Sequence, residues 1–330
     1  MAHQIETMAY VKRDGRDIPW HKLGNAIPEG FSSAEEIVTA AGLDWRVNLE
    51  RVFLESGREI EGARAIVRDR DARVFGVATD SYTPLQNLEA FESMSEWLAD
   101  GRMQFETAGA LGDGSKVWGL ARIGDDFRVA GKDAIAPYVL LQSGHDGATS
   151  LVLKPVVTRV VCANTLSVAL GERGFRRYSI RHTASIKERV KDGARALGLV
   201  LADSVALREK FDILAQTPAG PAELETVADL LFPMPDGAKV KDRVAFERDR
   251  KRAQDERLAL WKVYQTSATV DRGTAWGVFN AVTEYQDHFQ QRRGQNAISA
   301  NGDWLERRAV YSLDEGQNVR DRVFKVLIPA

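Results

Sequence analysis

The chain lacks most of the residues and motifs on which disulfide, metal and nucleotide sites depend. Its 330 residues include one cysteine, which excludes a disulfide framework and any zinc site with two or more thiolates. The five histidines are scattered singly, with no pair at i,i+4 and no H-E-x-x-H motif. The glycine motifs of dinucleotide and P-loop sites are missing as well. We therefore expect no cofactor and no metal.

Long apolar runs are also missing. No stretch approaches the roughly 18 uninterrupted apolar residues that a membrane span needs. The segment from Met1 to Gly15 lacks the apolar core of a signal peptide. Together with the lone cysteine, these absences lead us to expect a cytoplasmic protein without a membrane partner.

Charge of neither sign dominates the whole chain, which has 45 Lys and Arg against 47 Asp and Glu, but its distribution is uneven. Residues 1–130 hold 15 basic and 22 acidic residues, net −7, which leaves net +5 for residues 131–330. The strongest basic cluster runs from Glu172 to Arg195, with eight basic and three acidic residues. A solvated helix face and loop is the ordinary explanation, and a surface for an anionic partner is the alternative.

Hydrophobic patterning predicts an α+β fold of antiparallel β-meanders with packed helices and a helical C-terminal part. Short β runs separated by Gly and Asp turns occupy residues 45–77 and again 104–157. The first 60 residues otherwise read as turns and short pieces, except for a helix capped by Ser32 or Ser33 that ends near Gly42. A further helix is predicted over residues 87–98 between the two meanders.

Beyond residue 160 the pattern becomes mainly helical. We expect a short helix capped by Asn164, a strand over 175–181, and a long helix from Thr183 or Ser185 to Pro218. Residues 232–257 read as a linker that enters a solvent-facing helix, and 274–290 as another helix. The division that follows is a core domain of residues 1–216 and a helical region of residues 217–330.

The basic cluster suggests single-stranded nucleic-acid binding. A strand at 175–181 puts Arg177 and Arg181 on one face, with helical Lys187 and Lys191 after it. Basic side chains beside aromatic ones are typical of single-strand binding, although arginines on a strand also pair with carboxylates. The candidate contacts are Lys154, Arg159, Arg173, Arg176, Arg177, Tyr178, Arg181, His182, Lys187 and Lys191.

Two other kinds of function remain open. Cys162, with Asn164 nearby and a distant histidine, has the residues of a nucleophile and base, or else is a small buried side chain. His145 and Asp146, flanked by glycines, form either a functional loop or a hairpin turn. A stripe of Trp276, Phe279 and Tyr285 is either a protein-interaction surface or part of the core.

Five ordered motifs carry a family resemblance over nearly the whole chain. They are Pro19-Trp20-His21-Lys22-Leu23-Gly24, Tyr82-Thr83-Pro84-Leu85-Gln86-Asn87, His145-Asp146-Gly147, Arg159-Val160-Val161-Cys162-Ala163-Asn164-Thr165-Leu166 and Arg181-His182-Thr183. With them the chain resembles the phage/plasmid-related protein family, which is built on a domain of unknown function and occurs in phages, prophages, plasmids and their bacterial hosts.

The order of elements is in turn similar to that of phage single-strand annealing proteins of the Red-beta and RecT kind, an analogy of fold and context. The resemblance implies a homo-oligomer in the bacterial cytoplasm that binds single-stranded DNA in recombination or replication and needs no cofactor. In that case the basic candidates contact phosphates, Tyr178 or His182 contacts a base or sugar, and the acidic first half faces away from the DNA.

Overall fold

A computed structural model describes most of the chain. The described residues are 5–11, 24–27, 31, 33–99, 101–129, 131, 133–159, 165–166, 178–186, 188, 208–237, 242–268, 270–289 and 315–328. They fall into two compact units. Unit 1 comprises Met1–Asp126, Ala136–Val157 and Phe175–Ser204, and unit 2 comprises Phe127–Ile135, Thr158–Gly174 and Val205–Ala330. The boundary after residue 216 that the sequence suggests is not among these division points and stays a prediction.

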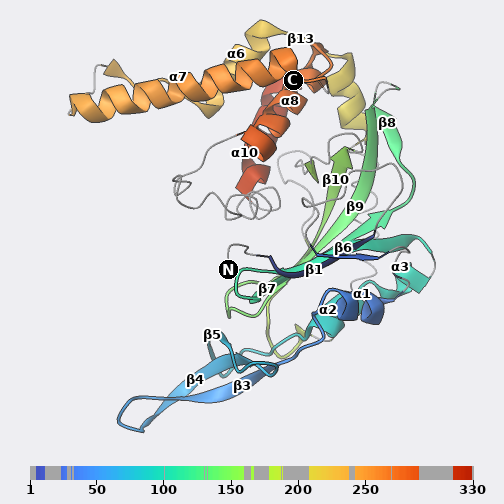
Figure 1. The fold of residues 1–330 in the computed structure, drawn as a ribbon, viewed down its shortest axis with the longest axis vertical. Helices are drawn as coiled ribbons and strands as arrows, with labels where there is room; N and C mark the ends of the chain where they lie inside the picture. Colours follow the sequence, from blue (N-terminus) through green and yellow to red (C-terminus); the bar gives the residue numbers. More distant parts are fainter. Residues whose placement is uncertain are drawn as a thin grey trace. The chain divides into compact units, whose positions relative to one another are not determined.

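The larger sheet has the strand order β11-β10-β9-β7-β6-β1-β2, with β12 paired to β10 and β8 paired to β9 (Figure 1). The pairs β6–β7, β7–β9 and β8–β9 are antiparallel, as expected of a meander. The strands are β1 (Ile5–Val11), β2 (Asn25–Ile27), β6 (Met103–Leu111), β7 (Lys116–Ile123), β8 (Phe127–Val129), β9 (Asp133–Gly144), β10 (Leu151–Arg159), β11 (Thr165–Leu166) and β12 (Tyr178–Ile180).

A second, three-stranded sheet in unit 1 consists of β3 (Val47–Phe53), β4 (Glu59–Arg68) and β5 (Val74–Thr79), all antiparallel. It is the first of the two expected meanders. Residues from both sheets and from the helices between them share one hydrophobic core, which includes Ile66, Phe91 and Phe105. The α+β class with antiparallel meanders is thus confirmed.

Strand β1 is an element that the sequence analysis missed, because we read this region as turns and short pieces. It pairs antiparallel with β6 and parallel with β2. Its sequence, Ile-Glu-Thr-Met-Ala-Tyr-Val, has no clean alternation of apolar and polar residues. Pairing with β6 buries Ala9 completely. The strand is therefore selected by tertiary pairing rather than by its own pattern.

Three helices of unit 1 lie within the described residues, and they correct one prediction. Helix α1 (Ala34–Ala40) begins as expected, with Ser33 Oγ accepting from the backbone N–H of Glu36 at 3.1 Å. The single helix expected over 87–98 is instead α2 (Asn87–Glu92) and α3 (Ser95–Ala99). Between them Ser93 Oγ donates to the carbonyl of Ala90 at 2.6 Å. A serine side chain that bonds the preceding turn competes with the helical ladder, which explains the break.

Unit 2 is built around a buried helix, α8 (Ala275–Glu284), which continues as a π-helical turn, η3 (Tyr285–Phe289). Trp276 packs on Phe211, with ring centroids 4.8 Å apart, and its Nε1 donates to Asp133 Oδ2 at 2.9 Å. The stripe of Trp276, Phe279 and Tyr285 is buried in this core, so it does not form an exposed interaction surface. Asn280 is fully buried in the same helix, and neither polar atom of its amide has a hydrogen-bond partner in the described part of the chain.

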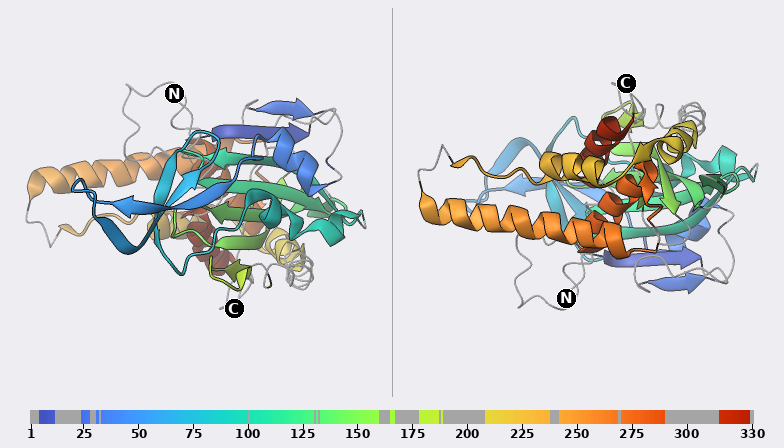
Figure 2. Two further views of the ribbon diagram at one scale, coloured as in Figure 1. Left: turned by 90° about the horizontal axis from the view of Figure 1, so that it is seen from below. Right: turned by 90° about the horizontal axis from the view of Figure 1, so that it is seen from above.

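The other elements of unit 2 surround α8 (Figures 1 and 2). The expected solvent-facing helix is α7, 24 residues long. Residues 208–216 are helical, within the long helix that we predicted, and residues 187 and 189–207 of that prediction lie outside the described residues. The remaining elements are β13 (Pro218–Ala219), α6 (Pro221–Leu231), α7 (Arg243–Thr266), β14 (Gly273–Thr274) and α10 (Glu315–Leu327). Among the helices of the described residues, none is both long and apolar enough to cross a membrane.

Candidate functional site

The ring of His145 lies at the centre of a buried group of side chains in unit 1. Its Nε2 is 2.8 Å from Oδ1 of Asn87, and the Asn87 Nδ2 donates to the backbone carbonyl of Leu43 at 2.9 Å. Because Nδ2 is used as a donor, Oδ1 must be the acceptor, and His145 therefore carries its proton on Nε2. The second ring nitrogen, Nδ1, is a buried lone pair without a hydrogen-bond partner in the described residues.

The surroundings of this imidazole keep it neutral. His145 is 1% exposed, and burial, followed by the nearby charge of His182, lowers its pKa to about 3, although Asp146 opposes the shift. Trp45 meets the ring edge-on at 5.2 Å, and Phe75 stacks on it at 6.2 Å. At neutral pH a group with this pKa binds protons too weakly to act as an efficient general base.

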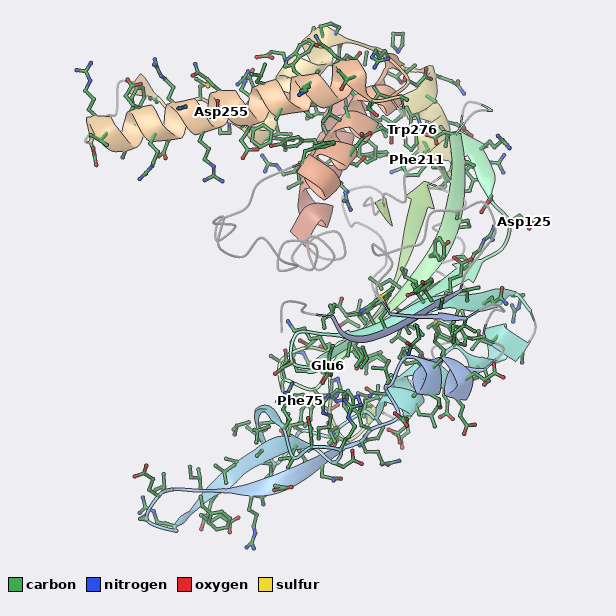
Figure 3. The ribbon with its side chains drawn as sticks, viewed as in Figure 1. Glu6, Phe75, Asp125, Phe211, Asp255 and Trp276 are labelled. Atoms are coloured by element: carbon green, nitrogen blue, oxygen red, sulfur yellow. The ribbon has the colours of Figure 1, made fainter. Side chains whose placement is uncertain are left out.

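Beyond the two aromatic rings lies a buried guanidinium. Arg68, 1% exposed, sits over Trp45 at 5.2 Å and over Phe75 at 5.3 Å. Both of its terminal nitrogens donate to Glu6 at 2.7 Å, and two further bonds of 2.7 and 2.8 Å reach Asp71. Figure 3 labels Glu6 and Phe75, which lie where β1 approaches the three-stranded sheet. The Arg68 charge is therefore compensated, and this arginine ties the two sheets together.

A second histidine lies in the same neighbourhood. His182 follows β12, is 7% exposed, and stacks on Tyr82 with centroids 5.1 Å apart and ring planes 7° apart. Its Nδ1 accepts from the backbone N–H of Leu85 at 3.4 Å, so Nε2 carries the proton. Burial lowers the pKa of His182 to about 4, against the opposing effects of Asp146 and of the Thr83 backbone, which favour the protonated ring.

The hydroxyl of Tyr82 and Nε2 of His182 also make no hydrogen bond within the described part of the chain. Burial, with a smaller effect of Asp146, raises the pKa of Tyr82, so its hydroxyl stays protonated. With Nδ1 of His145, the unpartnered atoms here comprise one acceptor, one donor and one hydroxyl. Such a set is better suited to hydrogen bonding than to proton transfer.

Asp146 has a structural role in its loop. Its Oδ1 accepts from the backbone N–H groups of Ala148 and Thr149, and its Oδ2 accepts from the Thr149 hydroxyl at 2.7 Å. Burial raises the pKa of this carboxyl, but these hydrogen bonds and Lys116 outweigh it and lower the pKa overall. Gly76 is required beside this loop, because a Cβ there would lie 2.6 Å from the Asp146 carbonyl oxygen. The turn interpretation of His145 and Asp146 thus describes the loop, while the His145 ring points into the core.

The rest of the alternative site, Cys162 and Asn164, lies outside the described residues. The helix that Asn164 was expected to cap does not begin there, because Thr165–Leu166 form strand β11. Among the residues that the structure describes, no group of three or more His, Cys, Asp or Glu side chains has the arrangement of a metal site.

Of the candidate nucleic-acid contacts, the structure describes the side chains of two. Arg181 is exposed, whereas His182 is buried beneath the Tyr82 ring, so the two residues are not on the same surface. Lys154 and Arg159 lie on β10 and Tyr178 on β12, with side chains outside the description. Arg173, Arg176, Arg177, Lys187 and Lys191 lie outside the described residues.

Sequence reasoning missed several members of the histidine site, namely Trp45, Arg68, Phe75, Tyr82 and Asn87. A signal was present, because Tyr82 and Asn87 begin and end one of the five motifs. The motifs at 82–87, 145–147 and 181–183 meet here: Thr83 N–H donates to the His182 carbonyl, and Asn87 bonds His145. Contacts across such sequence separations depend on the sheet register, which the motifs alone do not specify.

The fold and this site define an α+β protein in which three of the five motifs meet around two neutral histidines. The family model described as "Domain of unknown function (DUF932)" matches residues 74–309. The chain belongs to this family. No curated protein and no solved structure matches it.

Proposed function

We propose that this protein binds single-stranded DNA, as a homo-oligomer, in the recombination or replication of a phage, prophage or plasmid. The observation that carries the proposal is the concentration of positive charge between Glu172 and Arg195, net +5, in a chain that is net −2 overall. A local cluster of this kind attracts a phosphate backbone even when the whole chain is slightly acidic.

The position of β12 supports the proposal. This strand pairs antiparallel with β10 and buries Ile180 completely, whereas Arg181 is exposed at its end. Alternation along β12 puts Ser179 on the face opposite Ile180, and Ser179 is half-buried rather than buried. We leave His182 out of the proposed contacts because its ring is covered by Tyr82, and we keep the basic residues as proposed phosphate contacts.

Fluorescence anisotropy with a labelled single-stranded oligonucleotide at low and high salt tests this function. We expect binding that weakens with salt, because each phosphate contact adds about 0.7 to the slope of log K against log salt for a single strand. The variant R176A/R177A/R181A should then lower the slope by about 2. Arg58→Ala, an exposed arginine in the loop between β3 and β4, is the matched control and should change nothing. Absence of binding at low salt, or an unchanged slope in the triple variant, would refute the proposal.

A second candidate is an enzyme that uses Cys162 with a histidine of the buried site. The observation in its favour is that Nδ1 of His145 keeps a lone pair without a partner in the described residues. A catalytic thiolate has a lowered pKa and reacts with iodoacetamide even at pH 6, whereas a packed thiol reacts slowly in the native protein. Alkylation of native protein at pH 6 and pH 8, with unfolded protein as the reference, distinguishes the two. Slow alkylation at both pH values would remove this candidate.

A further inference from the structure

The first ten residues of α7, Arg243–Arg252, form a helical arm with no buried side chain. The buried residues of this helix begin at Ala253 and continue with Leu260, Val263 and Tyr264. In the arm the ring of Phe246 is half-buried, close to Gly237. Figures 1 and 2 show this end of α7 extending beyond the other helices of unit 2, and Figure 3 labels Asp255, just past the arm.

Local interactions hold the arm in helical form. Asp242 caps it by accepting from the N–H groups of Val244 and Ala245, at 2.9 and 3.2 Å. The ion pair between Arg250 and Glu247, at 3.0 Å, contributes only about 0.2 to 0.5 kcal/mol because it is exposed. An amphipathic packing face normally supplies most of the stability of a helix in a protein, and in the arm the structure shows only Ala245 and Phe246 as half-buried.

The arm presents a mixed cationic and apolar surface. It holds five basic and two acidic residues. Val244 is 81% exposed and Leu258 is 70% exposed, the two highest values among the large apolar side chains that the structure describes. At about 100° per residue, Val244, Lys251 and Leu258 share one stripe opposite the buried residues of α7. This stripe therefore carries two exposed apolar side chains with a lysine between them.

Unit 1 contains a surface of complementary chemistry. A groove of about 640 Å³ beside α1 and β2 has an apolar part formed by Ile27, Phe31 and Ala40. The exposed carboxylates of Glu35 and Glu36, in the first turn of α1, also line it, with Ser33 and Thr39. Residues 1–130, to which α1 belongs, are net −7. The groove therefore suits a ligand that carries both an apolar side chain and positive charge.

We propose that the arm of one copy of this protein docks in the α1 groove of a second copy. Val244 fills the apolar part of the groove, while Arg248 and Lys251, one and two helical turns further on, face Glu35 and Glu36. The two contacting surfaces differ, so the contact is heterologous and repeats from copy to copy, giving a closed ring or an open filament. A nucleic-acid phosphate backbone is the other candidate ligand of the arm. Phosphate binding would leave the exposed Val244 and the apolar part of the groove without a role.

Sedimentation velocity of the full chain over a range of concentrations tests the proposal through charge reversal. We expect the unmodified protein to form assemblies larger than one chain. R248E/K251E should dissociate them to single chains, and E35K/E36K should do the same. Combining all four substitutions should restore assembly, because an acidic arm then meets a basic groove. Mixing the two double variants should do the same, because the arm of each variant then meets a groove of opposite charge on the other. The matched controls are Arg58→Glu, in the loop between β3 and β4, and Glu61→Lys, on β4, both at exposed positions.

The possible outcomes separate this proposal from the DNA-binding function. A single chain at every concentration overturns the docking proposal, and so does a failure of the four-fold variant and of the mixture to assemble. If R248E/K251E keeps the assembly but loses the oligonucleotide, the arm contacts nucleic acid and docking is overturned while DNA binding stands. If the charge swap restores assembly and no oligonucleotide binds, docking stands and the proposed function fails. Circular dichroism confirms that each variant is folded.

Discussion

His145 and Asn87 share a hydrogen bond of 2.8 Å in the interior of unit 1, although they lie 58 residues apart in the chain. The bond joins the loop after β9 to the first residue of α2. Since the Asn87 amide also donates to the Leu43 carbonyl, this side chain connects α2, the loop after β9 and the segment after α1. The orientation and the tautomer of the His145 ring both depend on this one amide.

Replacing Asn87 by alanine should therefore lower the free energy of unfolding by about 1 to 3 kcal/mol, because it leaves the Leu43 carbonyl and the His145 N–H buried without partners. Urea unfolding followed by circular dichroism measures the change. Asn48→Ala, at an exposed position of β3, is the control and should stay within about 0.5 kcal/mol of the unmodified protein. An equal effect of the two substitutions would contradict the role we assign to Asn87.

The two buried histidines predict a loss of stability in mild acid. Their folded-state pKa values, about 3 and about 4, lie below the unfolded value near 6.5, so the unfolded chain binds more protons. The stability contributed by the neutral rings is fully present above pH 6.5 and is lost as the pH falls toward 4. In this window each ring should lower the free energy of unfolding by about 1.4 kcal/mol for each unit by which the pH falls.

Urea unfolding at several pH values between 7.5 and 4.5 measures this slope. His182→Phe retains an aromatic ring against Tyr82 but cannot titrate, so its slope should be about half as steep. The Asp146 carboxyl, with its lowered pKa, contributes at lower pH, as its folded form becomes protonated. A stability that is flat between pH 7 and pH 5 would show that neither histidine is buried in its neutral form.

Arg68 should be among the most sensitive positions of unit 1. Arg68→Met removes the buried cation from Glu6 and Asp71 and should cost about 3 kcal/mol, the lower end for breaking a buried pair, since both carboxylates keep some contact with water. Arg68→Lys retains the charge but not the fork of donors, so its free energy of unfolding should lie between those of the unmodified protein and Arg68→Met. Arg51→Met, whose exposed arginine pairs with Glu59 at 3.4 Å, should cost no more than about 1 kcal/mol. Chemical denaturation of the three variants ranks them, and a larger effect at Arg51 would refute this ordering.

Asn280 predicts a substitution that stabilises the protein. Its amide is fully buried in α8, and neither polar atom has a partner in the described residues, so burial costs free energy without compensation. Asn280→Leu keeps the branching and the number of side-chain heavy atoms, and it should raise the free energy of unfolding by about 1 to 3 kcal/mol. Thermal unfolding measures it, and Asn280→Asp should act in the opposite direction. Destabilisation by leucine would mean that the amide makes an interaction that the described residues do not include.

Local signals predicted the elements that local interactions stabilise. Ser33 caps α1 as the spacing to Glu36 predicts, and glycine turns separate the strands of both meanders. The break between α2 and α3 depends on the rotamer of Ser93, which no apolar periodicity reveals. β1 depends on its pairing with β6, almost a hundred residues later, so its own composition gives a weak signal.

The histidine site was predictable only in part. His145, Asp146 and His182 were singled out, but we placed His182 among surface contacts because a strand end beside arginines resembles an exposed position. The structure buries it through its stack on Tyr82, a partner exactly one hundred residues earlier in the chain. The neutral state of both rings depends on burial, and burial is a property of the folded core rather than of any motif.

Residues 127–135 form a hairpin that belongs to unit 2, although segments of unit 1 precede and follow it in the chain. Asp133 of that hairpin accepts a hydrogen bond from Trp276. During synthesis on the ribosome, this hairpin emerges well before α8, so Val129 and Ile135 have no helices of their own unit to cover them at first. Unit 2 can therefore complete its core only after translation has passed α8. Cutting the gene at a single point cannot separate the two units intact, and proteins trimmed from the C-terminus should expose this hairpin to chaperones and proteases.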